Sequence, residues 1–471
     1  MRDINQVYID GAFVTPHGEE RFELFNPSTE AVIGTVRLGD AEDARAAVAA
    51  AKRALPAWSR TTKEERIALL RRFHDAVAAR HDDLIDAIVE EYGAPRGRVE
   101  WMASMAATNF LEAAEALESY DFDQVIGHAE VRMTPLGVVA GITPWNSNAS
   151  FITAKMSMAL AAGCTIVIKP SEMSAIQTQV VMEALHEVDA PKGLFNIVTG
   201  RGDVVGAEFT SNPDVAKVTF TGSTAVGKSI LRAAAETMKR VTLELGGKGP
   251  QIILDDADLD AVMPAVVGSG FLNSGQACVA GTRILIPESR KAEALEKIKA
   301  AVAAVKAGDP HDPEVTVGPM VSQKQWDRVQ SYLKLGQEEG ATLLVGGEGR
   351  PEGQDAGWFV RPTVFADVTN DMRIAREEIF GPVLSVITYG TEEEAVAIAN
   401  DTSYGLQSYV LSSDTDRARR VAAQLEAGRV VINGAPHEPR APFGGFKQSG
   451  IGRENGVAGL LAYLEPKAVL V

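Results

Sequence analysis

The sequence predicts an α/β protein that contains two sheets of mainly parallel strands. Two series of short β-rich segments alternate with helical segments, one from residue 131 to residue 246 and the other after Gly247. Strands and helices that alternate at this spacing are typical of doubly wound sheets. The chain of 471 residues is also too long for one ordinary hydrophobic core. We therefore expect two or three domains.

The part of the chain before the first sheet is predicted to form long helices over residues 41–118. Asp40 and the Thr61–Glu65 segment each combine a capping side chain with acidic residues, which is the pattern of a helix start. Buried strands follow at residues 138–142, 165–169, 195–198 and 217–221, with helices at 149–162 and 174–188. The second series places strands at residues 251–254, 283–286, 383–387 and 429–433.

Residues 462–471 form an apolar, β-rich tail that has no partner strand next to it in the sequence. An apolar terminal strand needs a sheet edge with which to pair. We therefore expect the tail to pair with another subunit.

The composition argues against several classes of partner. The net charge is −17, from 46 basic and 63 acidic residues, and this disfavours nucleic acid because phosphate binding needs a basic face. Two cysteines cannot form a disulfide framework, which favours a reducing compartment. With no apolar leader and no membrane-length segment, we expect a cytoplasmic protein. The seven histidines are scattered, so we expect no bound metal.

Cys278 is the first candidate for chemistry. It lies in a stretch, residues 271–283, that changes from apolar to small and flexible residues. Glu244 lies in a second glycine-containing stretch, residues 243–248. A thiol and an isolated carboxylate held by glycine-rich backbone suggest a nucleophile with a general base. Taken alone, the pair is only suggestive.

A competing motif is present at residues 222–229, which match the phosphate-binding loop of P-loop nucleoside triphosphatases between a predicted strand and a helix. Residues 252–256 could supply the magnesium-binding aspartate of such an enzyme. Against this alternative, the loop follows several strands of its sheet, and the thiol stays unexplained. In the other interpretation, backbone N–H groups at Gly222 and Ser223 face a dinucleotide pyrophosphate, and Lys228 lies on the surface of the following helix.

Seven short motifs occur in a fixed order between the turn at residues 26–30 and the segment 463–467. They are Pro144-Trp145-Asn146, Lys169-Pro170-Ser171-Glu172, Phe220-Thr221-Gly222-Ser223, Leu243-Glu244-Leu245-Gly246-Gly247, Gly275-Gln276-Ala277-Cys278, Glu378-Ile379-Phe380-Gly381-Pro382 and Pro442-Phe443-Gly444-Gly445. With these motifs the chain resembles the NAD(P)-dependent aldehyde dehydrogenases over nearly its full length.

The resemblance implies a Rossmann-type NAD-binding domain, an α/β catalytic domain and a small β oligomerisation flap. Residues 1–118 and 137–246 would bind the dinucleotide, and residues 247–448 would carry the thiol. Residues 119–136 and 449–471 would form the flap, which implies a homodimer or a homotetramer.

The resemblance also implies a role for each catalytic residue. Cys278 would be the nucleophile, with a thiolate that attacks the aldehyde carbon and that a nearby base or backbone dipoles would help to form. Asn146 and the backbone N–H of Cys278 would form the oxyanion hole. Glu244 would activate the water that hydrolyses the thioester, and relatives that transfer the acyl group to coenzyme A tend to lack this glutamate. A relative that has kept the fold as a non-catalytic binding protein is a second alternative.

For the cofactor, the resemblance implies that Lys169 and Glu172 hold the adenosine ribose. A carboxylate at this position would repel a 2′-phosphate, which favours NAD and leaves NADP possible. The other residues expected to contact the cofactor are Ile142, Thr143, Pro144, Trp145, Ser171, Gly202, Gly206, Thr221, Gly222, Ser223, Leu245, Glu378 and Phe380.

The identity of the aldehyde is left open by the sequence. The residues expected to shape the substrate tunnel are Trp101, Met102, Phe151, Ala277, Val279 and Phe443. His437 and Arg440 are expected near its mouth, where Arg440 could pair with the carboxylate of a semialdehyde. An apolar or aromatic aldehyde fits the sequence at least as well.

Overall fold

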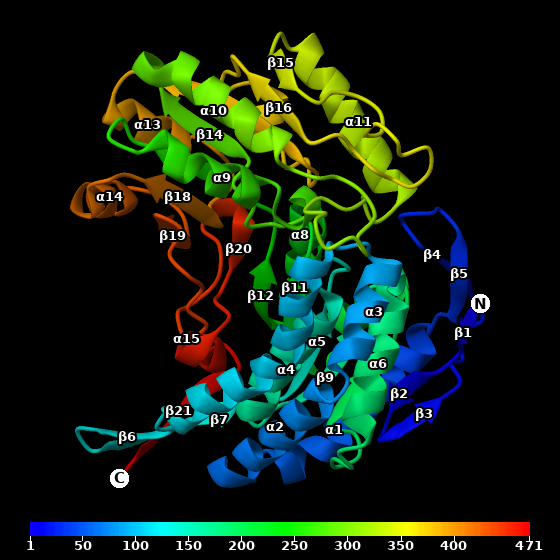
Figure 1. Cartoon of the computed structure of the whole chain (residues 1–471). Helices are drawn as coiled ribbons and strands as arrows, with labels where there is room; N and C mark the ends of the chain where they lie inside the picture. The colour runs from blue at the N-terminus through cyan, green and yellow to red at the C-terminus, as the bar shows by residue number, and fades with distance from the viewer.

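The computed structural model describes residues 1–471 and contains the α/β architecture that the sequence predicts (Figure 1). Its larger sheet has eight strands, five of which run parallel. In spatial order they are β20 (Gly450–Ile451), β12 (Arg240–Glu244), β11 (Val215–Thr221), β8 (Val138–Ile142), β9 (Thr165–Lys169), β10 (Phe195–Ile197), β2 (Val7–Ile9) and β3 (Ala12–Val14).

The order of these strands creates a topological switch point. From β8 the chain moves outward through β9 to β10, and it then returns to place β11 on the other side of β8. The connections on the two sides of such a point lead to opposite faces of the sheet, so a crevice opens at the carboxyl ends of the two strands. In this protein the crevice lies between the segments that follow Ile142 and Thr221.

Side chains of the parallel strands alternate between two apolar layers. Val138 and Ala140 pack with α1 (Ala41–Trp58), α7 (Ala207–Ser211) and α8 (Thr224–Ala235). Val139 faces the other layer, which contains α5 (Asn148–Ala161), α6 (Ala175–His186) and the long helices behind them. Since both faces are covered, these strands are buried and mainly apolar, as buried parallel strands are. The helices behind this layer are α2 (Lys63–Ala78), α3 (His81–Glu91) and α4 (Arg96–Glu118).

The predicted helix starts are confirmed at the level of single hydrogen bonds. Asp40 accepts from the backbone of Glu42 and Asp43 at the start of α1. Thr62 and Glu65 form a reciprocal capping box at the start of α2. Local side-chain chemistry thus sets where these helices begin.

The second sheet has seven strands, and all but β15 run parallel. Their order is β15 (Thr342–Val345), β16 (Thr363–Ala366), β17 (Val383–Tyr389), β14 (Arg283–Pro287), β13 (Pro250–Ile253), β18 (Gln407–Leu411) and β19 (Arg429–Ile432). One face is covered by α9 (Leu259–Gly270) and α10 (Lys291–Ala303). The other face is covered by α11 (Gln323–Glu338), α13 (Glu392–Asn400) and α14 (Thr415–Ala422), while the short α12 (Arg373–Arg376) follows β16.

The C-terminal tail has a partner strand within its own chain, and its expected pairing with another subunit stays a prediction. The tail forms β21 (Leu464–Leu470), which pairs antiparallel with β7 (Ala129–Pro135), and β6 (Asp123–Ile126) completes a three-stranded sheet. This sheet projects from the body of the molecule in Figure 1. Residues 131 and 468 are paired in these strands although they are far apart in the sequence. The local sequence therefore could not predict this pairing.

Two further segments differ from the expected division of the chain. β20 lies within the segment expected to form the flap, but it pairs with β12 at the edge of the eight-stranded sheet. At the N-terminus, β1 (Arg2–Ile4), β5 (Val32–Arg37) and β4 (Arg21–Phe25) form a small sheet of their own. After β20, α15 (Gly456–Leu461) leads into β21. No helix combines the length and the apolar character needed to cross a membrane.

Candidate active site

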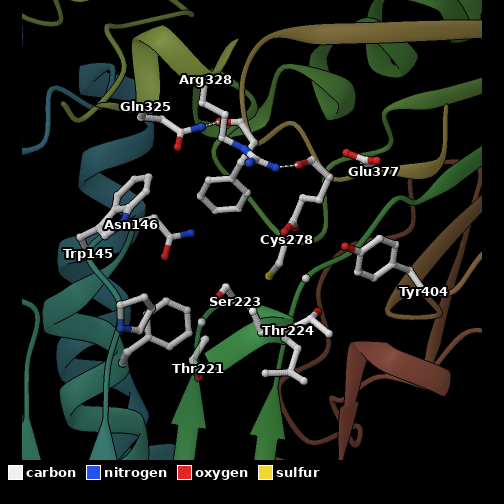
Figure 2. Close-up of a pocket in the computed structure, with 18 of the residues that line it drawn as sticks. Trp145, Asn146, Thr221, Ser223, Thr224, Cys278, Gln325, Arg328, Glu377 and Tyr404 are labelled. Carbon is white, nitrogen blue, oxygen red and sulfur yellow. Dashed lines mark hydrogen bonds between the residues drawn. The ribbon is translucent and has the colours of Figure 1, made fainter. Parts of the chain in front are cut away.

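A cavity of about 540 Å³ opens at the switch point and contains both Cys278 and Asn146 (Figure 2). The eight-stranded sheet, α11 and loops of the second sheet all contribute to its wall. Its lining residues are Pro144, Trp145, Asn146, Phe151, Thr221, Gly222, Ser223, Thr224, Ala225, Leu245, Gly246, Cys278, Gln325, Arg328, Tyr332, Glu377, Glu378, Phe380 and Tyr404.

The loop before Cys278 has an unusual backbone. Asn273, Ser274 and Gly275 are consecutive residues with φ of 56°, 59° and 73°, in the left-handed region. A Cβ atom at Gly275 would lie 2.1 Å from the carbonyl oxygen of Gly381, so only glycine fits at that position. Backbone strain of this kind persists where the surrounding structure fixes it, often at functional sites. The turn places the thiol at the cavity wall.

The Cys278 thiol is enclosed, and its surroundings oppose ionisation. Burial raises its pKa to about 12, and the negative charges of Glu378 and Glu244 act in the same direction. The positive charge of Arg429 acts in the opposite direction, with a smaller effect. The thiol is therefore protonated at neutral pH, and the carboxylates around it do not activate it by their charge.

Because only the thiolate reacts, alkylation of Cys278 by iodoacetamide is expected to accelerate about tenfold per pH unit between about pH 7 and about pH 9. The modified peptide can be quantified by mass spectrometry. Cys164, the only other cysteine, is fully buried, with a pKa raised to about 11 by burial, and serves as an internal reference. A Cys278 rate that levels off below about pH 8 would contradict the protonated state.

Asn146 is held by the same loop that carries the thiol. Its side-chain Nδ2 donates to the carbonyl oxygen of Gln276 at 3.0 Å, and its own carbonyl oxygen accepts from Nδ2 of Asn273 at 3.2 Å. One of the two N–H groups of the Asn146 amide is thus used for positioning, and the second has no hydrogen-bond partner in the protein. The second N–H is available to an oxygen atom in the cavity.

Asn148 explains how the loop after β8 keeps its shape. The fully buried Asn148 accepts from Oγ1 of Thr143 at 2.9 Å, and its Nδ2 donates to Oγ1 of Thr178 at 2.9 Å. These bonds tie the start of α5 to α6, which places Asn146 against the Cys278 loop.

Glu244 lies at the end of β12, directly before the cavity-lining Leu245, and does not itself line the cavity. Its side chain is 3% exposed, and neither carboxylate oxygen has a hydrogen-bond partner. Burial and the neighbouring Glu454 raise its pKa well above the ordinary value, while Lys155 and Arg453 lower it. Glu244 thus lies outside the lining of the cavity that contains Cys278 and Asn146, and its role as the general base stays a prediction.

A buried ion pair lies next to Glu244. Nζ of Lys155 donates to Glu454 at 2.6 Å and to Oγ1 of Thr219 at 3.2 Å, and the Lys155 side chain is fully buried. Glu244 thus adjoins a chain of groups that can exchange protons. An unpartnered carboxylate with a raised pKa beside such a chain has the properties of a general base.

The expected cofactor residues fall into two groups. Eight of them line the cavity, namely Pro144, Trp145, Thr221, Gly222, Ser223, Leu245, Glu378 and Phe380. The remaining seven, namely Ile142, Thr143, Lys169, Ser171, Glu172, Gly202 and Gly206, lie outside that lining. Among these, Ile142 pairs with Lys169 across the ends of β8 and β9, and Nζ of Lys169 lies 3.1 Å from Glu172.

Glu378 closes the cavity beside the thiol loop. Its Oε1 accepts from the backbone N–H of Gly247 at 2.9 Å, and a Cβ atom at Gly246 would lie 2.4 Å from its Oε2. Burial raises the pKa of Glu378 to about 7, although the Gly247 hydrogen bond and Lys248 oppose this rise. Gly246 is thus explained by close contact with this carboxylate, whereas a Cβ atom at Gly247 would lie 2.3 Å from the carbonyl oxygen of Cys278.

Sequence reasoning missed the side of the cavity formed by α11. Gln325, Arg328 and Tyr332 lie on one face of this helix, and Figure 2 shows Gln325 and Arg328 above the thiol. Nε2 of Gln325 donates to the Phe380 carbonyl oxygen at 2.7 Å, and Nη2 of Arg328 donates to that of Glu378 at 2.6 Å. Their i, i+3, i+7 spacing marks a helix face, but nothing in the sequence says which face meets the cavity.

The nucleoside triphosphatase alternative is not supported. Ser223 caps α8 two residues after β11, which leaves no room for a loop that wraps a phosphate. Lys228 is exposed and donates to the side chain of Gln448 at 2.8 Å, as expected for a surface lysine. Asp256, the candidate magnesium ligand, follows β13 of the other sheet and accepts from Ser412.

The expected substrate residues are dispersed. Phe151 lines the cavity, and Ala277 and Val279 flank the thiol. Trp101 is 42% exposed, whereas Met102 is 1% exposed within the helical core, so Met102 does not face open space. Phe443 is half-buried, and the Arg429 guanidinium lies 5.0 Å from its ring.

The two residues expected near the mouth of the tunnel differ in their surroundings. His437 accepts from the Arg429 guanidinium at 3.1 Å. Arg440 is exposed and forms a bidentate pair with Glu438 at 2.7 and 2.8 Å. Its charge is therefore already neutralised, which argues against Arg440 as the residue that binds a substrate carboxylate.

Comparisons with known proteins agree with this geometry. A model of the aldehyde dehydrogenase family matches residues 13–469. A 3-succinoylsemialdehyde-pyridine dehydrogenase from a Pseudomonas species is 45% identical and covers 100% of this chain and 99% of its own length. The structure of a cysteine-to-alanine mutant of Aldehyde Dehydrogenase C from Pseudomonas syringae, complexed with NAD⁺ and octanal, is 43% identical with a TM-score of 0.97, covering 99% of this chain and 96% of its own.

A Mycobacterium tuberculosis aldehyde dehydrogenase complexed with NAD⁺ is similar as well. It is 41% identical with a TM-score of 0.96, and the match covers 100% of this chain and 98% of that one. Identity and coverage at this level extend over both sheets and the flap. The chain therefore belongs to the aldehyde dehydrogenase family, as its motifs predict.

Proposed function

We propose that the protein oxidises an aldehyde to the carboxylic acid, with NAD as the hydride acceptor and a covalent intermediate on Cys278. The observation that carries this proposal is the shared cavity of the Cys278 thiol and the Asn146 amide at the switch point of the dinucleotide-type sheet. NAD⁺ and octanal in the complex of the Pseudomonas syringae relative support the assignment of both ligands.

In the first step the Cys278 thiol loses its proton to solvent, and its sulfur bonds to the aldehyde carbon to form a thiohemiacetal with a negative oxygen. The free N–H of Asn146 and the backbone N–H of Cys278 would donate to the oxygen on which negative charge develops. The negative carbonyl oxygen makes the carbon a better hydride donor. Bound NAD⁺ supplies the hydride acceptor, and loss of the hydride leaves a thioester on Cys278.

In the second step water cleaves the thioester. Glu244 would remove a proton from this water as the oxygen attacks, so that the carboxylic acid leaves and the thiol is restored. Since both oxygens of Glu244 lack protein partners, the carboxylate can turn toward the cavity without breaking a hydrogen bond. The Lys155–Glu454 pair is placed to take the proton onward. We therefore propose hydrolysis instead of transfer to coenzyme A.

The residues around the cavity fit NAD. The N-terminus of α8 faces the cavity through Ser223, Thr224 and Ala225, where backbone N–H groups and the helix dipole favour a pyrophosphate. The enclosed Glu378 carboxylate would accept from the hydroxyls of the nicotinamide ribose. Lys169 and Glu172 would hold the adenosine ribose, and the negative charge of Glu172 favours NAD over NADP.

A spectrophotometric assay of NADH formation tests the proposal. The protein would be incubated with short aliphatic, long aliphatic and aromatic aldehydes, with NAD and NADP in parallel reactions. We expect acid and NADH in equal amounts, and a higher kcat/KM with NAD. Absence of reduced cofactor with every aldehyde would refute the assignment and favour a binding protein.

We also propose a cytoplasmic homodimer or homotetramer that associates through the flap. The expected division into a dinucleotide-binding part, a catalytic part and a flap is kept in this proposal. Both outer edges of the three-stranded sheet are free, and Val125, Ile126 and Leu470 are exposed by 77%, 62% and 74%. Exposed apolar residues on an unpaired sheet edge favour association. A single monomeric species in sedimentation at micromolar concentration would refute this proposal.

A further inference from the structure

Arg429 is a half-buried cation without a carboxylate partner. It begins β19, and no Asp or Glu oxygen lies within salt-bridge distance of it, whereas Arg440, Arg417 and Arg376 all have such partners. Its Nε donates to the Gln407 side chain, and Nη1 donates to Nδ1 of His437 at 3.1 Å. Three of the five guanidinium N–H groups therefore have no protein partner.

The groups that surround this guanidinium carry no compensating negative charge. Gln407 is neutral, and the ring of Phe443 lies 5.0 Å from the guanidinium carbon. Burial and the charge of Arg429 lower the pKa of His437, so this imidazole is neutral at neutral pH. A partly buried guanidinium is unfavourable without a counter-ion, and its planar shape matches a carboxylate.

Hydrogen bonds through two side chains link Arg429 to the backbone of the thiol loop. The side chain of Gln407 donates to the hydroxyl of Tyr409, and this hydroxyl donates to the carbonyl oxygen of Val279 at 2.6 Å. Arg429 and Gln407 are also paired residues of neighbouring strands, so their relative position is fixed by the sheet. The cation is thus held at a constant place behind the residue that follows Cys278.

We propose that Arg429 binds a carboxylate at the far end of the aldehyde, so that the preferred substrates are aldehydes with an anionic tail. This inference rests on the proposed function, because it names the substrate class of the same thiol. Two parallel N–H groups of the guanidinium would face the carboxylate, and Phe443 would pack against the alkyl part of the substrate.

Matched aldehyde pairs test this assignment. Succinic semialdehyde is compared with butanal, and adipic semialdehyde with hexanal, and selectivity is the ratio of the two kcat/KM values. In the wild-type protein the anionic member of at least one pair is expected to be preferred. Arg429→Gln should lower that ratio about 10- to 100-fold, as expected for loss of a charge-assisted hydrogen bond. Arg429→Lys keeps the positive charge but cannot donate two parallel hydrogen bonds as the guanidinium can, so it should give an intermediate ratio.

Two other arginines provide matched comparisons. Arg440→Gln removes a positive charge that Glu438 already neutralises, and it should leave the ratio unchanged. Arg98 is the competing candidate, because its Nε is buried without a partner and its guanidinium lies 3.8 Å from the ring of Trp101. A ratio that falls in Arg98→Gln and not in Arg429→Gln would overturn the proposal. The proposal would also be overturned if Arg429→Gln lowered kcat/KM equally for neutral and anionic aldehydes.

A second measurement does not depend on turnover. Iodoacetate and iodoacetamide both alkylate the thiolate, but only iodoacetate is anionic. Any effect of Arg429 on the ionisation of Cys278 changes both rates equally and therefore cancels in their ratio. This ratio is expected to fall in Arg429→Gln, and an unchanged ratio would contradict an anion site at Arg429. If no aldehyde is oxidised while the alkylation ratio falls, the proposed function fails and the anion site stands.

Discussion

Cys278→Ala is expected to abolish NADH formation from every aldehyde, with a loss of about 10⁴-fold or more in kcat, because the sulfur forms the covalent bond on which both chemical steps depend. Oxidation without this bond would need direct hydride loss from a hydrated aldehyde. The measurement is the steady-state rate of NADH formation, followed by absorbance, with the acid product quantified separately.

Binding of NAD should survive this substitution. The residues proposed to hold the cofactor lie on α8, on the loop after β8 and at Glu378, and none of their hydrogen bonds uses the Cys278 side chain. Isothermal titration calorimetry should therefore give a similar Kd for NAD in the variant. Cys164→Ala is the matched control, since this thiol is fully buried inside the fold and donates only to the Tyr463 carbonyl oxygen. Substantial turnover by Cys278→Ala would overturn the mechanism.

Glu244→Gln is expected to form one equivalent of NADH per active site and then to turn over about 10²- to 10⁴-fold more slowly than the wild type, as is typical for loss of a general base. Attack by the thiol and loss of the hydride leave the thioester in place, and the amide of glutamine cannot take a proton from water. Stopped-flow absorbance separates the burst from the steady state.

The raised pKa of Glu244 also sets the pH dependence of this step. Burial favours its protonated form, so the carboxylate that acts as a base becomes available only as the pH rises through a value well above the ordinary one. The rate of thioester hydrolysis should therefore increase with pH in the wild type, at pH values above the ordinary carboxylate range, and lose this dependence in Glu244→Gln. Glu244→Asp, which retains a carboxylate, should recover part of the steady-state rate. Normal turnover without a burst in Glu244→Gln would assign the base to another residue.

Local signals in the sequence predicted much of the fold. The capping residues Asp40 and Thr62 act within three residues of their partners, and the strands of residues 138–142 and 165–169 both contain an apolar run. Strands β15, β16 and β18 were not predicted. β18, for example, has Gln407 and Ser408 within its buried residues, and only the neighbouring strands explain why these polar groups are tolerated.

In the site, too, the residues that belong to sequence motifs could be predicted, whereas those positioned by tertiary packing could not. Cys278, Asn146 and Glu378 belong to motifs, and the structure gathers them at one cavity. Arg328 lies in an ordinary amphipathic helix, and its contact with the Glu378 carbonyl depends on how α11 packs. Likewise, Arg440 and Arg429 look equivalent in the sequence. Only their partners, Glu438 for one and neutral groups for the other, separate them.

The most direct test of the mechanism is to identify the bond formed during the burst. Glu244→Gln would be mixed with NAD and octanal, quenched in acid after one turnover, digested and analysed by mass spectrometry. We predict an acyl group, at the oxidation level of the acid, on the peptide that contains Cys278 and on no other. NADH formed in the burst without this adduct, or an acyl group on Cys164 instead, would contradict covalent catalysis by Cys278.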